Sequence, residues 1–175
     1  MPPASARRPL LEDQDNVARI AVAEIVVTTE SPSSNAALHL VEGLARELRE
    51  RYGDAANEAF YPADVQVPGG AFVIAWLGER PLGFGAFGPL RPGVGELKRV
   101  FVEKDVRQQG VGGRILGQLE AVARRTGYDA LRVAPRVTQP EAVHLYTSAG
   151  YAPIPRYGRY VDDPLYLCLE KRLDV

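Results

Sequence analysis

A glycine-rich turn between a predicted strand and a predicted helix constrains this chain more than any other feature. Residues 96–102 (ELKRVFV) are rich in β-branched and aromatic side chains, which predicts a strand, and residues 107–113 (RQQGVGG) lead into a helical pattern. Because glycines leave no Cβ in the way, the main-chain N–H groups of residues 108–113 can point at one anion, with the positive end of the helix dipole behind them. The stretch therefore predicts a site for a ligand that carries phosphates.

The spacing of the glycines separates the known kinds of phosphate-binding loop. A dinucleotide fingerprint needs a glycine three residues after Gly112, where Ile115 stands, and a P-loop needs a Gly-Lys-Ser/Thr sequence that the chain lacks. The remaining pattern, Arg107-x-x-Gly110-x-Gly112, resembles the acyl-CoA pyrophosphate loop of the GNAT N-acetyltransferase superfamily. The resemblance implies a phosphate cradle made by Gln108, Gln109, Gly110, Val111, Gly112 and Gly113.

A second motif follows after one more predicted strand. Residues 139–151 (QPEAVHLYTSAGY) resemble the second GNAT signature, a short helix that carries Ala-x-x-Leu-Tyr and closes on Gly-Tyr. Together the motifs cover about the C-terminal half of the chain, and the N-terminal half matches only in its pattern of elements. The chain is thus identified as a member of this superfamily. That implies an α/β GNAT fold with a mixed central sheet of about six to seven strands flanked by helices, and acetyl-CoA as the acyl donor.

Length and composition limit the number of domains and the kinds of partner that can be expected. A chain of 175 residues is sized for one domain, with a flexible tail at 1–17 and a GNAT domain at 18–175. A net charge of -1 gives no reason to expect nucleic acid or a membrane surface as partner. The single cysteine permits no internal disulfide, which is typical of a cytoplasmic protein. Dimers are widespread in the family, so a homodimer is an open alternative to a monomer.

Periodicity places the remaining elements. After the N-terminal strand, a helix begins near a capping Ser33 or Ser34, and three strands then form an antiparallel run. A helix crossover next implies parallel pairing between the third of these strands and the strand that follows. The predicted strands are 18–30, 71–78, 82–90, 96–102, 130–135 and two more around 161–164; the predicted helices are 35–53, 111–126 and 139–149.

The resemblance also assigns catalytic roles. Glu96 falls where several GNAT enzymes carry a glutamate general base that deprotonates the attacking amine, although other members use ordered water. Tyr146 falls on the tyrosine of the second signature, and its O–H group is the candidate acid for the departing coenzyme A thiolate. The plain alternatives are a glutamate that closes a hairpin and a tyrosine packed on the core.

Further residues are assigned to the coenzyme. The main chain of Val100, Phe101 and Val102 resembles the strand edge that pairs with the pantetheine arm, and Gln139 stands where the family often has an asparagine that contacts this arm. Arg107 and Arg114 are candidates for ion pairs with the phosphates, or else solvated arginines. No metal is expected, because His39 and His144 lie on separate helices without ligand spacing.

The acceptor is the least determined part. Lys98 is expected on the same strand face as Glu96 if no bulge intervenes, and cations and tyrosines gather near the last hairpin: Tyr151, Arg156, Tyr157, Arg159 and Tyr160. This favours a small amine that also bears a carboxylate, such as an amino acid, over the alternative of ligand-free surface charges. The predicted activity is acetyl transfer to a primary amine of a small molecule by direct attack. Protein lysine or N-terminal acetylation, and a non-catalytic acyl-CoA-binding module, are the alternatives.

Overall fold

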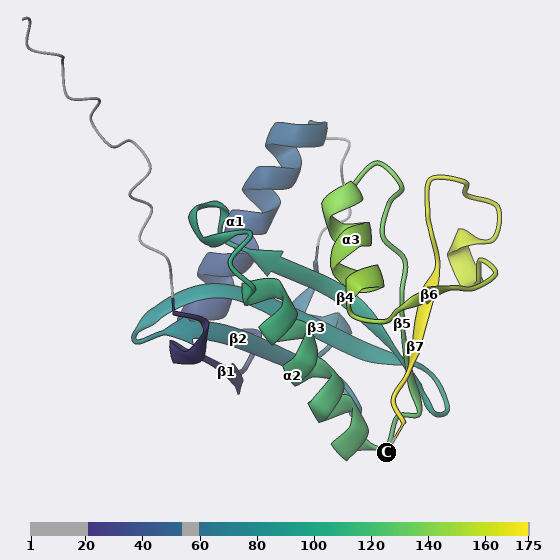
Figure 1. Cartoon of the computed structure of the whole chain (residues 1–175), viewed down its shortest axis with the longest axis horizontal. Coiled ribbons are helices and arrows are strands. Elements are labelled where there is room, and N and C mark those ends of the chain that lie inside the picture. Colours follow the sequence, from purple (N-terminus) through teal and green to yellow (C-terminus); the bar gives the residue numbers. More distant parts are fainter. Residues whose placement is uncertain (1–20, 54–59, 175) are drawn as a thin grey trace, which may run out of the picture.

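The computed structural model describes residues 21–53 and 60–174, and within these residues one mixed sheet forms the centre of the molecule (Figure 1). The strands lie in the order β1-β2-β3-β4-β5-β7-β6. This confirms the predicted mixed sheet. The tail predicted for 1–17 and the start of the strand predicted for 18–30 lie outside the described residues. None of the described helices is long and apolar enough to cross a bilayer.

The first four strands form the antiparallel part of the sheet. They are β1 (Ile25–Thr29), β2 (Ala71–Leu77), β3 (Arg80–Arg91) and β4 (Val94–Val102). Each pairs antiparallel with the next, so the predicted antiparallel run of β2–β4 is confirmed, and β1 adds a fourth strand that the sequence did not place. Gly78 has a φ of 58°, and it supplies the left-handed residue that the tight turn between β2 and β3 requires.

The sheet opens where the chain changes to parallel pairing. β4 is followed by α2 (Val111–Thr126) and β5 (Ala130–Val133), and β4 pairs parallel with β5 as predicted. The pairing joins only Val94–Glu96 to Ala130–Arg132, and the two strands then diverge (Figure 1). The short helix α3 (Pro140–Ser148) lies at this gap. The opening leaves the later part of β4 with an unpaired edge on the β5 side.

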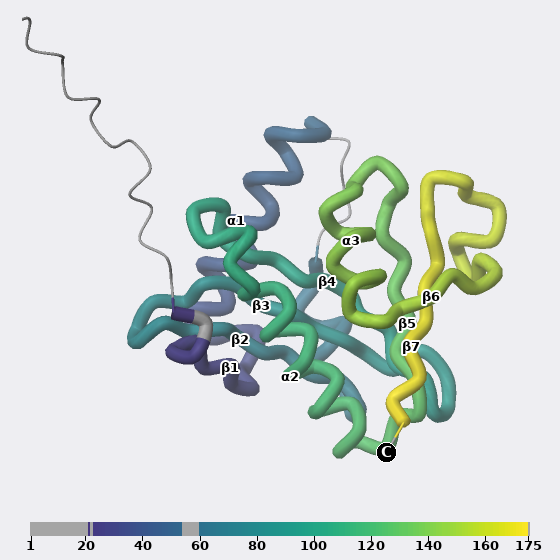
Figure 2. The backbone as a smooth tube through the Cα atoms, viewed as in Figure 1, coloured from purple at the N-terminus to yellow at the C-terminus, as the bar shows by residue number. Residues whose placement is uncertain are grey.

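The C-terminal segment completes the sheet in a different order from the chain. β6 (Ala152–Pro153) and β7 (Leu169–Arg172) are antiparallel, and β7 lies between β5 and β6. The two strands expected around 161–164 are present but short, and the connection between them contains a 3-10 turn, Gly158–Tyr160. Figure 2 shows this connection as a long excursion beside α3. The other 3-10 turns are Val22–Glu24, Pro62–Asp64 and Lys104–Val106.

Helices cover both faces of the sheet with separate hydrophobic clusters. One cluster packs α1 (Asn35–Tyr52) against the aromatic side chains of β2, β3 and β4. The other packs α2 and α3 against the opposite face. Both long helices have the caps that the sequence predicts: the Ser34 hydroxyl accepts from the Ala37 N–H at 3.2 Å, and Gly127 ends α2 with a φ of 98°.

A one-residue slip in β4 decides which side chains share a face. Ala86 pairs with Arg99 but Phe87 pairs with Leu97, so Lys98 has no partner on β3. Leu97 consequently packs in the α2-side cluster, whereas Phe101, four residues later, packs in the α1-side cluster. In a regular strand these two side chains would point to the same face. A bulge therefore lies at Lys98, so the condition under which Lys98 was expected on the same strand face as Glu96 is not met.

Candidate active site

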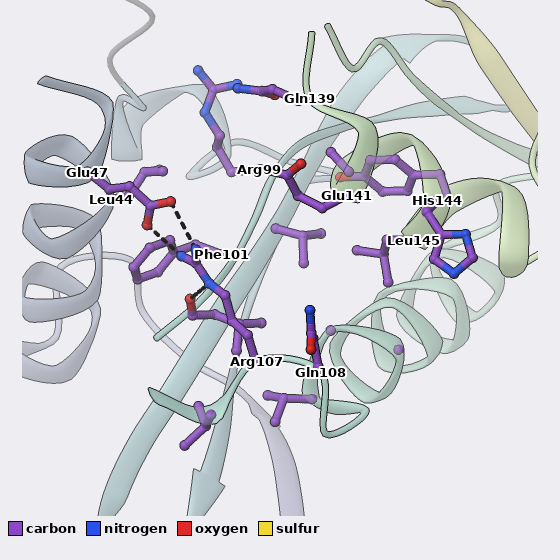
Figure 3. A pocket seen from close by; sticks show the side chains of 18 of the residues that line it. Leu44, Glu47, Arg99, Phe101, Arg107, Gln108, Gln139, Glu141, His144 and Leu145 are labelled. Carbon is purple, nitrogen blue, oxygen red and sulfur yellow. Dashed lines mark hydrogen bonds and ion pairs between the residues drawn. The ribbon is translucent and has the colours of Figure 1, made fainter. Parts of the chain in front are cut away.

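A cavity of about 730 Å³ opens where β4 leaves β5. Its wall is formed by the last turns of α1, the end of β4, the loop into α2, and α3 (Figure 3). Most of the residues predicted to contact the coenzyme line it, together with Tyr146: Val100, Phe101, Val102, Arg107, Gln108, Gly110, Val111, Gly112, Gly113 and Gln139. The two sequence motifs thus meet at one site. Glu96, Gln109 and Arg114 are not among its lining residues.

The loop before α2 has the conformation that a phosphate cradle requires. Gln108 and Gly110 are left-handed, with φ of 60° and 84°. Gly110 is the N-cap, and no side chain within the described residues caps this helix end. The Arg114 N–H donates to the Gly110 carbonyl at 3.2 Å, so the first-turn N–H groups before it have no acceptor within the helix. These groups and the helix dipole favour an anion at this end of the cavity.

Gly112 lies where the start of α2 approaches α3. A Cβ placed there would lie 3.4 Å from a methyl group of Leu145 on α3, and Gly113 has open space around it. The close approach of α2 and α3 at Gly112 joins the two motifs, and the bare main chain at Gly113 remains accessible from the cavity. The residues present therefore fit a phosphate-bearing ligand.

Arg107 has a different setting from the one expected. Its Nε donates to the Val102 carbonyl at 2.8 Å, and its Nη1 donates to Glu47 Oε1 at 3.0 Å. The guanidinium is therefore paired with a carboxylate of α1 rather than presented as an unpaired cation. The prediction of a phosphate-binding Arg107 side chain does not match this arrangement. The Val102 carbonyl, part of the edge expected to pair with pantetheine, is occupied by the same arginine.

Arg114 also points elsewhere. Its Nη2 donates to the main-chain carbonyl of Ile25 on β1 at 2.7 Å, so this side chain ties α2 to the edge of the sheet and lies off the cavity wall. The expected pairing of Arg114 with phosphate stays a prediction. The local sequence could not indicate the contact between Arg114 and Ile25, because the two residues are 89 positions apart.

Tyr146 lies in the wall of the cavity and is almost completely buried, with 6% of its surface exposed. Burial raises its pKa to about 12, and the nearby charge of Arg99 opposes part of the rise. The hydroxyl is therefore protonated throughout the neutral range, which an acid in catalysis requires. Its ring packs edge-on against Tyr151, with centroids 5.8 Å apart.

Gln139 contacts a helix that the sequence did not connect with it. Its Nε2 donates to the Tyr52 hydroxyl at 3.1 Å, at the end of α1. The side chain still lines the cavity, as expected for a contact with the pantetheine arm.

Glu96 is buried on the α1 face of the sheet, with 6% of its surface exposed. Lys98 Nζ donates to Oε1 at 2.7 Å, and the Tyr157 hydroxyl donates to Oε2 at 2.7 Å. Lys98 thus contacts Glu96 directly, although the bulge breaks the strand alternation on which their shared face was expected. Burial, followed by the bond to Glu96, raises the pKa of Tyr157, so this hydroxyl remains a donor to the carboxylate.

The C-terminal aromatic residues divide between the two faces. The Arg132 guanidinium lies over the Tyr157 ring, 4.9 Å from the ring centroid. The ring centroids of Tyr157 and Tyr160 are 5.5 Å apart. Arg159 lies 4.8 Å over the Tyr160 ring. Tyr151, by contrast, is buried in the α2-side cluster, and its expected place at the acceptor side stays a prediction. The single cysteine, Cys168, is buried.

Several polar residues of the cavity were not found from the sequence. They are Glu47, Arg51, Arg99, Arg136, Glu141 and His144. Glu47 gave one available signal: it is a charged residue on the apolar stripe of a helix, three positions after Leu44, and both are buried. Within the described residues, no group of three or more metal-ligating side chains is present.

Comparison with known proteins identifies the architecture. A mixed sheet that opens after its fourth strand, with a glycine-rich helix start at the opening, defines a class of acyltransferases. Residues 37–151 match the model of the acetyltransferase (GNAT) family. The chain belongs to this family and is a GNAT N-acetyltransferase.

Individual relatives support the same assignment. The chain is 33% identical over 150 residues to a protein named IAA acetyltransferase from Azospirillum brasilense, which covers 85% of this chain and 98% of the relative. A crystal structure from Klebsiella pneumoniae, assigned as an acyl-CoA N-acyltransferase, has 27% identity and a TM-score of 0.71 over 87% of this chain and 99% of its own. A GNAT acetyltransferase from Elizabethkingia anophelis with bound acetyl-CoA has 16% identity and a TM-score of 0.63, over 85% and 98%.

Proposed function

We propose that the protein binds acetyl-CoA in the 730 Å³ cavity and transfers the acetyl group to a primary amine of a small molecule by direct attack. The observation that carries the proposal is the first turn of α2, whose N–H groups lack helical acceptors and lie in the cavity wall. Such a turn binds phosphate through its main chain and dipole. When bound, acetyl-CoA would supply an acyl thioester that is open to attack.

Cofactor binding uses main-chain groups at two places. The cradle residues from Gln108 to Gly113 hold the phosphates, and the unpaired edge of β4 at Val100 faces the pantetheine arm as an added strand would. The Val102 carbonyl is satisfied by Arg107, so the proposed strand-edge contact falls on Val100. Gln139 lies across the cavity from this edge and can donate to or accept from the amides of the arm.

Glu96 is the proposed base. An alkylammonium group has a pKa of ~10 and must lose a proton before its nitrogen can attack the thioester carbonyl. As the C–N bond forms and the C–S bond breaks, Glu96 takes the amine proton, directly or through water. Lys98 and the Tyr157 hydroxyl each occupy one of its oxygens, and they fix the orientation of the carboxylate. Each oxygen retains a lone pair for this proton.

Tyr146 is the proposed acid. Its hydroxyl supplies a proton to the sulfur as the thiolate departs, which avoids a free charge in an apolar wall. Burial keeps the hydroxyl protonated, with a pKa of about 12. Glu96 lies on the α1 face of the sheet and Tyr146 belongs to the α2-side cluster, so the proposal places the amine and the thiolate on opposite sides of the acyl carbon.

The acceptor is proposed to carry a carboxylate beside its amine. Lys98 has two N–H donors beyond the one that contacts Glu96, and about a third of its side chain is exposed. Arg156 and Arg159 add exposed cationic residues on the same C-terminal connection. A carboxylate held by Lys98 would bring the attached amine towards Glu96. Acetylation of a small metabolite also agrees in kind with the name of the Azospirillum relative.

Isothermal titration with acetyl-CoA, followed by a panel of amines, tests the proposal. We expect acetyl-CoA to bind the parent protein and one or more amino-acid-like amines to be acetylated, with coenzyme A released in equal amount. The decisive pair is an amino acid and its carboxyl-amidated analogue, for which we expect a KM at least ~10-fold higher, equivalent to the loss of one charge-assisted contact. Equal rates on the two compounds would refute the proposal that the protein recognises a carboxylate on the acceptor. Activity confined to peptides would favour the protein-acetylation alternative.

A further inference from the structure

We propose that Glu47 is a positioning residue for the phosphate cradle, acting through Arg107. The inference rests on the proposed acetyl-CoA site. Glu47 lies on α1, 60 residues before Arg107, and belongs to neither sequence motif. It is nevertheless one of three buried charged residues in the described part of the chain, and it lines the cavity.

Arg107 joins three elements through its guanidinium. Nε donates to the carbonyl of Val102, the last residue of β4, and Nη1 and Nη2 donate to the two oxygens of Glu47 at 3.0 and 2.5 Å (Figure 3). This two-pronged contact fixes the plane of the guanidinium as well as its distance. The first residue of the loop is thereby held against the end of β4 and the middle of α1.

The next residue explains why such an anchor matters. Gln108 is the only non-glycine residue with positive φ in the described ranges, at 60°. A left-handed conformation at a residue with a side chain is costly and persists only where the surroundings impose it. Arg107 is the immediate neighbour of Gln108, and its three bonds supply that constraint. The turn that aims the N–H groups of the cradle therefore depends on an anchor whose acceptor is Glu47.

The charge of Glu47 gives a second argument. An anionic carboxylate in the wall of a cavity for a phosphate-bearing ligand would repel that ligand unless it were neutralised. The paired Arg107 neutralises it, and only 10% of the Glu47 side chain is exposed. Removal of the carboxylate would leave the arginine side chain without its main acceptor. Glu47 thus contributes through the conformation of Arg107 rather than by contact with the ligand.

The same carboxylate extends the connection to α3. Arg51 Nη2 lies 3.3 Å from Glu47 Oε1, and Arg51 Nη1 lies 2.9 Å from Glu141 Oε1. The hydrogen bond from Arg51 is the main cause that lowers the pKa of Glu141, and the same bond raises the pKa of Arg51. This outer pair is exposed and therefore weak. Glu47 is the buried residue of this network. Through Arg107 it contacts the start of the cradle loop, and through Arg51 it is connected to α3, the helix that carries Tyr146.

Three variants test the inference: Glu47→Gln, Arg107→Lys and the double variant Glu47→Gln/Arg107→Lys. Isothermal titration gives the Kd for acetyl-CoA, and steady-state kinetics give KM and kcat. We expect Glu47→Gln to raise the Kd and the KM for acetyl-CoA about 10-fold while kcat at saturation changes less than about 2-fold. Because both residues act as one unit, the double variant should bind about as weakly as the weaker single variant.

Glu120→Gln is the matched control. Glu120 is a buried carboxylate of α2 that accepts from Lys171 at 2.8 Å, and it lies outside the cavity lining. We expect Glu120→Gln to lose about as much thermal stability as Glu47→Gln, and to keep the Kd of the parent protein for acetyl-CoA. If Glu47→Gln does not fold, Arg107→Lys carries the same expectation, because it keeps the charge and loses the two-pronged geometry.

The outcomes separate the two proposals. A folded parent that does not bind acetyl-CoA would refute the proposed cofactor site and this inference with it. A parent that binds, with Glu47→Gln and Arg107→Lys binding equally well, would refute the role of Glu47 alone. An equal loss of affinity in Glu120→Gln would show that lost stability, and not the anchor of the loop, causes the effect.

Discussion

The two ends of β4 build their sites from different materials. Beyond its C-terminal end, the loop from Gln108 to Gly113 presents main-chain N–H groups, and the side chains mainly stay out of the way. Near its N-terminal end, Glu96 depends on side chains, one from two residues later and one from Tyr157, 61 residues later. A main-chain site is altered by adding atoms, whereas a side-chain site is altered by removing them. The difference predicts which substitutions affect each end.

The largest effect is expected from an addition at the main-chain end. Gly112→Asp places a carboxylate beside the proposed phosphate site, where repulsion between two charges ~4 Å apart costs roughly 4 kcal/mol, or about 10³-fold in affinity. Titration calorimetry with acetyl-CoA measures it. Gly117→Asp is the control, because Gly117 lies on the same helix with open space around it and is exposed. Unchanged affinity in Gly112→Asp would contradict a main-chain cradle.

A removal at the side-chain end should act on turnover instead. Glu96→Gln keeps the shape and loses the base, so we expect kcat to fall about 10²-fold with an unchanged Kd for acetyl-CoA. The control is Glu120→Gln, since Glu120 is equally buried at 6% and is also paired with a lysine. Should kcat in Glu96→Gln stay near the parent value, ordered water would be the base.

Tyr146 tests whether the main-chain end also uses a side chain. Tyr146→Phe removes only the hydroxyl, and we expect kcat to fall roughly 10-fold while acetyl-CoA still binds. Pre-steady-state kinetics identify conditions in which chemistry limits the rate. A variant that matches the parent under those conditions would leave Tyr146 as a packing residue, and the comparison between the two ends would become sharper.

A separate prediction concerns stability at high pH. Burial raises the pKa of Tyr146 from its ordinary value of ~10 to about 12, so its stabilising contribution is complete below pH ~10 and is lost as the pH rises through 12. The loss is at most about 1.4 kcal/mol per pH unit. Urea unfolding between pH 9 and 12 should show a shallower decline for Tyr146→Phe. Tyr61→Phe, at an exposed tyrosine, should keep the parent slope.

The same contrast explains how much could be predicted from the sequence. The cradle was predictable because glycine at 110, 112 and 113 reports a main-chain requirement directly in the residue type. Helix ends at Ser34 and Gly127 were predictable for the same local reason. The order of β2–β4 followed from short connections, and the parallel step followed from the crossover helix.

Contacts between distant segments were not predictable. Arg107 and Arg114 carry the charge that a phosphate site requires, yet their partners are Glu47 and the Ile25 carbonyl, 60 and 89 residues earlier. Nothing in the local residue pattern specifies such a partner. The burial of Tyr151 in the α2-side cluster was likewise not predictable, because the face on which a side chain lies after a glycine cap depends on how β6 enters the sheet.

Because Lys98 has no partner on β3, the alternation of β4 side chains between the two faces of the sheet shifts by one residue at this position. Before it, odd-numbered side chains face α2; after it, even-numbered ones do, as Leu97, Val100 and Val102 show. Glu96 consequently shares the α1 face with Phe101 in the cavity wall. Substitution at 98 leaves this parity intact, and deletion of Lys98 would also keep it, because the shortened strand would place Glu96 and Phe101 on one face by regular alternation. The bulge therefore absorbs one residue of β4, and without it the five-residue separation of Glu96 and Phe101 would put the proposed base on the opposite face.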